Sequence, residues 1–236
     1  MAGVTTDPGA ARSGADGPDP DQADLVRRGY DELSYRYRAD DAAPAGYGPW
    51  LERLLSLLPP AAAVLDLGCG CGVPVARTLA GAGHHVTGVD FSEVQVGRAR
   101  ALVPAATFIQ ADVTQAEFAD DSFDAIVSLY TLIHIPVAAQ PGLLRRAGRW
   151  LRPSGRLLVT TGYDAWTGSD PGWLGGRTPM YWSQADAAAS RGWIRDAGLV
   201  ITGEETVPEG SSAHALFWAQ RPGPAGPAAQ AEAGSQ

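Results

Sequence analysis

Short apolar runs alternate with amphipathic segments from about residue 61 to residue 220. The apolar runs are "AAVLDL", "HHVTGVD", "ATFIQAD", "FDAIVSLY" and "GRLLVTTG", and the segments between them include "VPVARTLAGAG", "SEVQVGRARALV" and "QPGLLRRAGRWL". Strands of continuous apolar character separated by amphipathic helices predict a parallel sheet that is covered on both faces. A further helix is expected in "DAAASRGWIRDAG". The last two runs, "LVITGEETV" and "HALFWAQ", follow one another without a helix, which predicts a C-terminal antiparallel hairpin.

The regions around this alternating pattern differ from it in character. Residues 1–22 and 221–236 are rich in Pro, Gly and Ala with little to bury, so we expect two disordered tails. Residues 23–60 hold two helix candidates, "ADLVRRGYDELSYRYRADD" and "YGPWLERLLSLL", the second ended by "PP". The core is expected over 61–220, interrupted by an aromatic and glycine-rich insert at 164–182. The predicted organisation is one α/β domain.

Composition excludes several classes of function. The chain of 236 residues can bury one substantial core, and its net charge of −8 disfavours a protein that follows a nucleic-acid backbone. All basic residues are Arg, so an enzyme that needs a Lys Schiff base is excluded. The N-terminal residues do not resemble a secretory signal, and no apolar run could span a membrane. The two cysteines are too close to bridge easily, so we expect a cytoplasmic protein. A monomer or a homodimer is expected.

A glycine-rich turn follows the first strand, in the stretch "VLDLGCGCGVP". Gly68, Gly70 and Gly72 allow close approach of a ligand, and Asp66 precedes them. Nicotinamide proteins use G-x-G-x-x-G, whereas this spacing is G-x-G-x-G, with an acid that would repel an anion. Cys69 and Cys71 lack the further ligands of a tetrahedral metal site, so no metal is expected.

Three consecutive strands of the pattern end in Asp66, Asp90 and Asp112. In an open parallel sheet these strand ends meet at the ligand-binding edge. An acid at the second strand suits ribose hydroxyls, and one at the third can meet an adenine amino group. The three carboxylates therefore suit a nucleoside that carries an amino acid and no phosphate.

The motifs "VLDLGCGCG", "VTGVDFS", "IQADV" and "FDAIVSLYTLIHI" together resemble those of class I S-adenosylmethionine-dependent methyltransferases, over roughly residues 25–220. The resemblance implies a Rossmann-like seven-stranded sheet of order 3-2-1-4-5-7-6 and S-adenosyl-L-methionine as cofactor. It assigns Asp66 to the amino-acid end, Asp90 to the ribose and Asp112 to the adenine. The other expected cofactor contacts are Tyr37, Phe91, Val113, Ser128 and Tyr130, with the three glycines.

Candidate acceptor residues lie outside these motifs. His134 follows the fourth strand and is the candidate general base, although it could instead order its loop. Tyr30 shares a helix face with Tyr37. The expected substrate pocket joins Tyr30 to aromatic and apolar residues of the insert, which either form a lid or anchor a loop on the core: Trp166, Trp173, Met180, Tyr181 and Trp182.

We therefore expect a methyltransferase that acts on O or N of a small molecule, without a nucleic-acid or membrane partner. Specialised-metabolite biosynthesis is one setting that the size and the insert fit. Three alternatives remain at this point. They are a protein that binds the same cofactor for a non-methylating reaction, a methyltransferase of RNA or protein, and, less favoured, an NAD(P)-dependent oxidoreductase.

Overall fold

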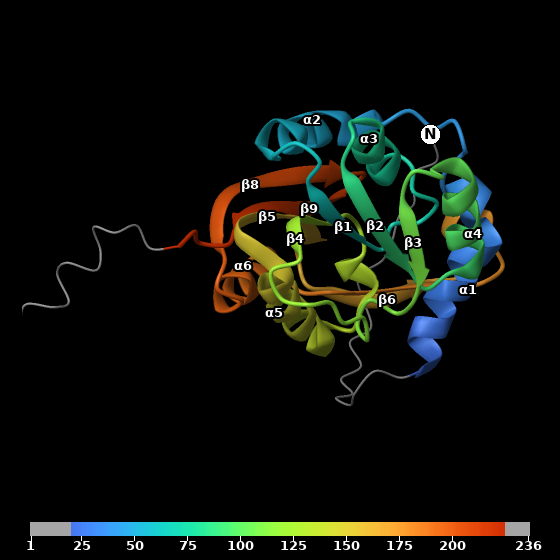
Figure 1. Ribbon diagram of the computed structural model, residues 1–236. Helices are drawn as coiled ribbons and strands as arrows, with labels where there is room; N and C mark the ends of the chain where they lie inside the picture. Colours follow the sequence, from blue (N-terminus) through green and yellow to red (C-terminus); the bar gives the residue numbers. More distant parts are fainter. Residues whose placement is uncertain (1–19, 225–236) are drawn as a thin grey trace, which may run out of the picture.

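A seven-stranded sheet forms the centre of the computed structural model, which describes residues 20–224 (Figure 1). Its strands are β1 (Ala63–Leu67), β2 (His85–Asp90), β3 (Thr107–Gln110), β4 (Phe123–Ser128), β5 (Leu151–Gly162), β8 (Val200–Glu209) and β9 (Ser212–Gln220). Their order is β3-β2-β1-β4-β5-β9-β8, and β9 runs antiparallel to both of its neighbours. Because β8 and β9 are the sixth and seventh strands of this sheet, the predicted order and the C-terminal hairpin are confirmed.

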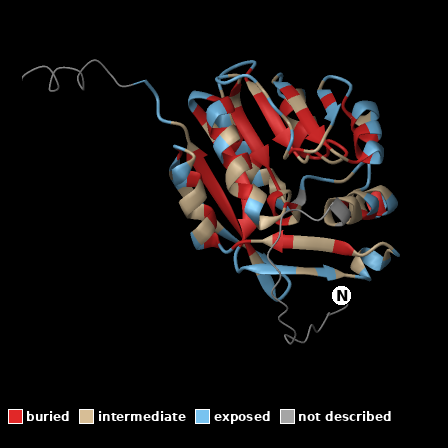
Figure 2. Ribbon diagram, turned by 90° about the horizontal axis from the view of Figure 1, so that it is seen from below, coloured by how far each residue is buried: buried red, intermediate tan, exposed pale blue. Residues whose placement is uncertain are grey.

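Helices cover both faces of the sheet and bury its apolar side chains (Figure 2). One face packs against α2 (Gly48–Leu57), α3 (Val75–Gly81) and α4 (Glu93–Leu102), with Leu54 and Leu79 fully buried. The other packs against α5 (Gln140–Trp150) and α6 (Ala187–Asp196), with Leu143 and Trp150 at its centre. This two-sided burial explains why the central strands β1 and β4 are apolar along most of their length, whereas the edge strand β8 alternates.

Helix α1 (Pro20–Tyr37) crosses the site region and is tied to α4 by buried polar contacts. Ser34 Oγ donates to Gln95 Oε1 at 2.9 Å. The buried guanidinium of Arg98 donates to Ser34 Oγ, to the Arg38 carbonyl and to Asp40. Since a buried charge is costly without partners, this network fixes α1 at one position over the carboxyl ends of the strands.

The insert forms a separate two-stranded antiparallel sheet of β6 (Trp166–Asp170) and β7 (Met180–Gln184), joined through η4 (Trp173–Gly175). The sequence predicted a lid or a loop anchored on the core there, and it did not predict strands, because two five-residue strands rich in Gly, Ser and Trp give no clear alternation. The Glu32 carboxylate of α1 accepts hydrogen bonds from the backbone N–H groups of Arg177 and Thr178, each at 3.0 Å. The insert is thereby attached to α1.

The ends of the described region differ slightly from the expected boundaries. Helix α1 begins at Pro20, before the expected boundary at residue 23, and Arg221 contacts the Leu151 carbonyl beyond the expected end of the core. The rest of the two predicted tails, 1–19 and 225–236, lies outside the described residues.

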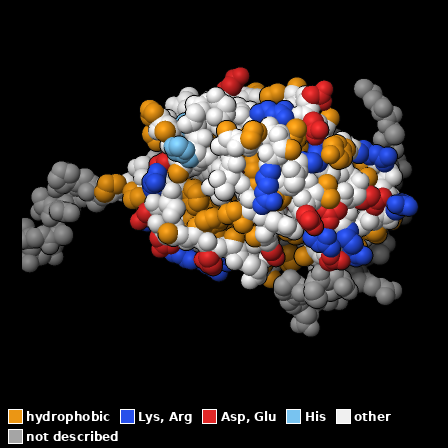
Figure 3. Space-filling model, turned by 45° about the vertical axis from the view of Figure 1, so that its right-hand side comes forward, with side chains coloured by type: hydrophobic (Ala, Val, Ile, Leu, Met, Phe, Trp, Pro, Cys, Tyr) orange, Lys and Arg blue, Asp and Glu red, His pale blue; other side chains and the backbone are white. Residues whose placement is uncertain are grey.

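Within residues 20–224, each helix is too short or too polar to cross a bilayer. On the face that Figure 3 shows, the described Arg side chains are interspersed with acidic ones and form no continuous basic stripe.

Candidate functional site

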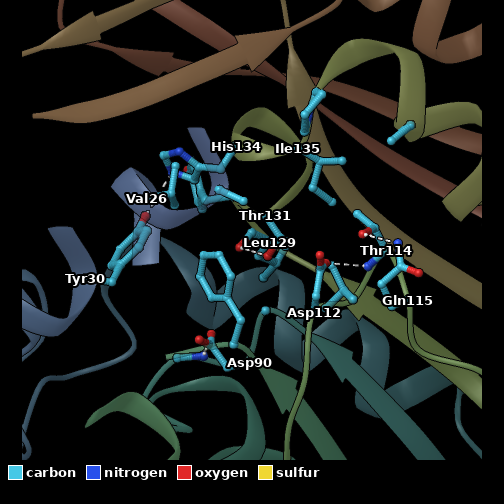
Figure 4. A pocket seen from close by; sticks show the side chains of 18 of the residues that line it. Val26, Tyr30, Asp90, Asp112, Thr114, Gln115, Leu129, Thr131, His134 and Ile135 are labelled. Carbon is cyan, nitrogen blue, oxygen red and sulfur yellow. Dashed lines mark hydrogen bonds between the residues drawn. The ribbon is translucent and has the colours of Figure 1, made fainter. Parts of the chain in front are cut away.

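A cavity of about 620 Å³ lies at the carboxyl ends of the central strands, between them and α1 (Figure 4). This is a typical size for a small-molecule site. Asp90 and Asp112 lie on its strand side, and Tyr30 and His134 lie across from them. The other predicted site residues that line it are Tyr37, Gly68, Gly70, Phe91, Val113 and Tyr130. The structure thus brings together residues that are widely separated in the sequence.

The turn after β1 brings backbone, not side chains, to the cavity. Gly68 has a φ of +73°, and a Cβ there would lie 2.0 Å from Thr131 Oγ1. Gly70 also has a positive φ, +52°, but a Cβ there would meet nothing within 4 Å. Gly72 does not line the cavity, and its Cβ would lie 3.2 Å from Phe108, so this glycine serves packing. The first glycine is required by the fold, whereas the second leaves space for a ligand.

Two carboxylates on the cavity wall are oriented by backbone N–H groups. Asp90 accepts from Gly70 N–H at 2.9 Å and from Ser92 N–H at 3.0 Å, one bond to each oxygen. Burial raises the pKa of Asp90 to about 6, although these bonds oppose the rise. Asp112 accepts from Thr114 N–H at 2.7 Å. Each carboxylate oxygen has a second lone pair for a ligand hydroxyl or amine.

Asp66 lies in a smaller adjoining cavity of about 50 Å³, on the other side of the glycine turn. It is 2% exposed, and its Oδ2 has no hydrogen-bond partner among the described residues. Burial, with a smaller contribution from the Asp90 charge, raises the pKa of Asp66 to about 8. Buried polar groups are rarely left without a partner, so this carboxyl is available to accept hydrogen bonds from a cationic ligand.

Arg38 faces the same small cavity and was missed by sequence reasoning. Its guanidinium donates to Tyr47 Oη at 3.2 Å and lies 5.0 Å from the Tyr47 ring centre. Among residues 20–224, no carboxylate lies within 4.0 Å of it. Arg38 directly follows Tyr37, an expected cofactor contact, and this position was the signal that sequence reasoning could have used. The small cavity therefore has a carboxyl group on one wall and a guanidinium on another.

His134 is hydrogen-bonded through both ring nitrogens. Its Nδ1 lies 2.7 Å from the Tyr181 carbonyl oxygen, and its Nε2 lies 2.9 Å from Tyr30 Oη. A carbonyl can only accept, so Nδ1 carries the hydrogen, and burial lowers the pKa of His134 to about 4. Nε2 of the neutral ring therefore accepts from Tyr30. The candidate base is thus hydrogen-bonded to Tyr30 through Nε2, and its Nδ1–H bond to Tyr181 joins its turn to the insert.

The insert residues that were expected to form a substrate pocket do not line the cavity. Trp173 packs against the rings of Tyr30 and Tyr37, with ring centres 5.4 and 5.7 Å apart. Trp182 lies 5.7 Å from the His134 ring, and Trp166 packs on Trp182 while remaining 49% exposed. The insert thus supports the wall residues from behind instead of forming the wall.

Three more predicted residues occupy other places. Met180 is fully buried, and a Cβ at Gly29 of α1 would lie 2.8 Å from its Cε. Tyr181 contributes its backbone carbonyl to His134. Ser128 is buried behind the cavity wall, 1% exposed. In their place the cavity is lined by residues that the sequence did not single out, among them Ala23, Val26, Thr131, Ile135 and Pro136.

Comparison with known proteins agrees with this geometry. Residues 64–155 match a family model described as a methyltransferase domain. The 27-O-demethylrifamycin SV methyltransferase of Amycolatopsis mediterranei is 38% identical over 116 residues, which cover 46% of this chain and 42% of that protein. A sterol 24-C-methyltransferase of Gibberella zeae is 36% identical over 116 residues, covering 44% of this chain and 30% of that protein. The chain matches less than half the length of these relatives.

Solved structures share the fold over most of the chain. The 1,6-didemethyltoxoflavin-N1-methyltransferase of Burkholderia thailandensis, determined with 1,6-didemethyltoxoflavin and S-adenosylhomocysteine bound, has a TM-score of 0.67 at 21% identity. The similarity covers 90% of this chain and 94% of that one. The (4+2)-cyclase SpnF has a TM-score of 0.62 at 20% identity, covering 84% of this chain and 95% of that one. At these identities the likeness shows the fold.

Proposed function

Because the chain carries a class I S-adenosylmethionine-dependent methyltransferase domain, we propose that it transfers a methyl group from S-adenosylmethionine to O or N of a small molecule. One observation carries the proposal. The three strand-end carboxyl groups, Asp66, Asp90 and Asp112, line two adjoining cavities around one glycine turn. Carboxyl groups in these places suit the ammonium, ribose and adenine groups of one ligand. The two relatives reported above are named for methylation of small molecules, one at oxygen and one at carbon, which supports a small-molecule acceptor.

The residues present fit this cofactor. Asp66 would accept from the α-ammonium group and Arg38 would bind the α-carboxylate, since the two lie on one small cavity. Asp90 would accept from the ribose hydroxyls and Asp112 from the adenine amino group. The cofactor supplies an electrophilic methyl carbon. The protein then has to align the acceptor, exclude water and remove a proton.

Tyr30 and His134 are the groups that would remove this proton. Tyr30 Oη lies on the cavity and donates its hydrogen to His134 Nε2. An acceptor hydroxyl can therefore give its proton to the Tyr30 oxygen while the Tyr30 proton passes to Nε2. His134 Nδ1–H, held by the Tyr181 carbonyl, stabilises the imidazolium that forms. Burial disfavours a positive charge on this ring, so the resting form of His134 is the neutral imidazole, which can accept the proton at Nε2.

The proposal is tested by calorimetric titration with S-adenosylmethionine, S-adenosylhomocysteine and NADPH, followed by an acceptor screen. Micromolar binding of the two sulfur compounds and no binding of NADPH are expected. The screen should find a hydroxylated or amine-bearing molecule whose mass rises by one methyl group as S-adenosylhomocysteine accumulates. Binding of NADPH alone would overturn the proposal.

Tyr30→Phe and His134→Ala should each lower kcat by about 10²–10⁴-fold, the usual contribution of general acid–base catalysis. Neither side chain is assigned to the cofactor, so the Kd for S-adenosylhomocysteine should change little. The double variant should be no slower than the worse single one, because the two groups act as one unit. Tyr35→Phe, on the same helix but 65% exposed, is the matched control. Full activity in either site variant would contradict the assignment.

Arg38→Met should weaken S-adenosylhomocysteine binding by about 10–100-fold, the loss expected for a charge-assisted hydrogen bond. Methylthioadenosine lacks the carboxylate, so its affinity should be the same for the variant and the wild type. Calorimetry with both ligands measures the two effects. An equal loss for both would mean that Arg38 acts on the shape of the site and not on the carboxylate.

A non-methylating reaction that uses the same cofactor is the second candidate function. The structural likeness to the (4+2)-cyclase SpnF favours keeping it, since one fold hosts several chemistries. The two functions are separated by stoichiometry. Methyl transfer releases one S-adenosylhomocysteine per product, whereas a rearrangement of the substrate releases none.

A further inference from the structure

Gln140, the first residue of α5, makes an unusual set of contacts for a buried amide. It is 1% exposed, and its Nε2 lies 2.9 Å from the Leu132 carbonyl, 2.8 Å from that of Ile135 and 2.8 Å from that of Ser183. Carbonyl oxygens can only accept, so the NH₂ end must face them. Two hydrogens are thus shared among three acceptors.

The three carbonyl groups belong to two segments that are far apart in the sequence. Leu132 and Ile135 bracket the turn η2 (Leu132–His134), and Ser183 lies on β7 of the insert. A second bond joins the same segments, because Val137 N–H donates to Ser183 Oγ at 3.1 Å. Gln140 is therefore the buried link between the turn that carries His134 and the strand that carries Tyr181.

The link between η2 and β7 affects which ring nitrogen of His134 carries hydrogen. Which ring nitrogen of a neutral histidine carries hydrogen is set by the hydrogen bond that the other one makes. Here the Tyr181 carbonyl of β7 holds the hydrogen on Nδ1 and leaves Nε2 to Tyr30. A neutral histidine side chain in water prefers hydrogen on Nε2, so the observed arrangement depends on the position of β7 relative to η2.

We propose that Gln140 is a positioning residue that fixes the tautomer of His134, by joining η2 to β7 so that the Tyr181 carbonyl stays on Nδ1. The effect of this tautomer on catalysis rests on the proposed function, but the tautomer itself can be measured independently of it. Gln140 lines neither the large nor the small cavity. Its role is therefore separate from binding of the cofactor.

The test is ¹⁵N NMR of histidine-labelled full-length protein, with His134 assigned by the signal missing from His134→Asn. The wild type should show hydrogen on Nδ1 of His134. Gln140→Met keeps the length of the side chain and removes both donors, so a mixed or Nε2–H population is expected. Gln110→Met, on the exposed edge strand β3, should leave the spectrum unchanged. A wild-type Nε2–H tautomer, or an unchanged tautomer in Gln140→Met, overturns the proposal.

Kinetics with the acceptor found in the screen separates positioning from general damage. Gln140→Met should lower kcat about 10-fold or more, as loss of part of the base's effect, with the Kd for S-adenosylhomocysteine unchanged. If Gln140→Met does not fold, Ser183→Ala removes the second bond of the same link and should shift the tautomer in the same direction. No shift in that variant would also overturn the proposal. Because the NMR result needs no acceptor, failure to find methyl transfer would leave it standing.

Discussion

Asp66→Asn should raise the thermal stability of the cofactor-free protein and at the same time weaken S-adenosylhomocysteine binding by about 100-fold or more, the scale of a broken buried ion pair. The wild-type carboxyl is 2% exposed, with one oxygen unpaired among the described residues. At neutral pH this carboxyl is ionised in the unfolded chain but has to be protonated on folding, because its pKa is about 8 in the folded chain; Asn does not carry this cost. Relief of part of that cost should raise the melting temperature by roughly 3–10 °C. Function and stability are thus expected to oppose each other at this residue.

The pH dependence of stability follows from the same burial. The pKa of Asp66 is about 8 in the folded chain, above its ordinary value of 3.8, so the folded state binds more protons than the unfolded one between these values. Stability of the cofactor-free protein must therefore fall as pH rises from about 4 to about 8. Asp90, with a pKa of about 6, adds to this fall at the acid end. His134 opposes it there, because its pKa is lowered from 6.5 to about 4 and the unfolded chain binds more protons between these values. In Asp66→Asn the slope between pH 6 and 8 should nearly disappear.

Binding should show the opposite trend. The ammonium group requires the carboxylate form, so the protein has to release a proton on binding below pH 8. Affinity for S-adenosylhomocysteine should rise with pH, up to about tenfold per unit, and level off near pH 8. Calorimetry in buffers of different ionisation enthalpy measures the released proton directly. Asp41→Asn, at an exposed position, should reproduce the wild type in every respect, and a pH-independent affinity would contradict the role of Asp66.

The part of this site that the sequence predicted is the part made by strand ends. Asp66, Asp90 and Asp112 each follow an apolar run, and parallel pairing alone brings such positions to one edge of the sheet. The glycine turn is equally local, because its spacing and its positive φ values belong to one short segment. These features depend only on periodicity and backbone geometry.

The remaining features depend on contacts between distant segments. The Tyr30–His134 pair joins residues 104 positions apart, and it depends on the position of α1 beside α4, where Arg98 and Ser34 hold it. The same position brings Arg38 to the small cavity. The insert residues were predicted to face a substrate, but they pack behind the residues that line the cavity. Aromatic content alone does not show which of these two places a side chain takes. No local sequence pattern encodes contacts between segments that lie this far apart in the chain.

Gly68→Ala and Gly70→Ala should separate the fold from the function within one turn. Both have positive φ, so each alanine costs about 1–2 kcal/mol of backbone strain. At Gly68 the new Cβ would also lie 2.0 Å from Thr131 Oγ1, which donates to the Leu67 carbonyl at 2.9 Å and is not free to turn away. Overpacking of this kind adds about 1–3 kcal/mol. Gly68→Ala should therefore lower the melting temperature by roughly 5–15 °C.

At Gly70 the new methyl group would meet no protein atom within 4 Å, and it would stand on the cavity that the proposed cofactor occupies. Gly70→Ala should lose only the strain, roughly 2–8 °C, yet bind S-adenosylhomocysteine at least about tenfold more weakly. A double-mutant cycle with Thr131→Ala distinguishes the two causes. Thr131→Ala should restore part of the stability of Gly68→Ala, because it removes Oγ1 and Cγ2, the two nearest clashing atoms, and leaves only Cβ at 2.8 Å. It should restore none for Gly70→Ala. Additive effects at Gly68 would show that strain alone, and not the contact with Thr131, excludes a side chain there.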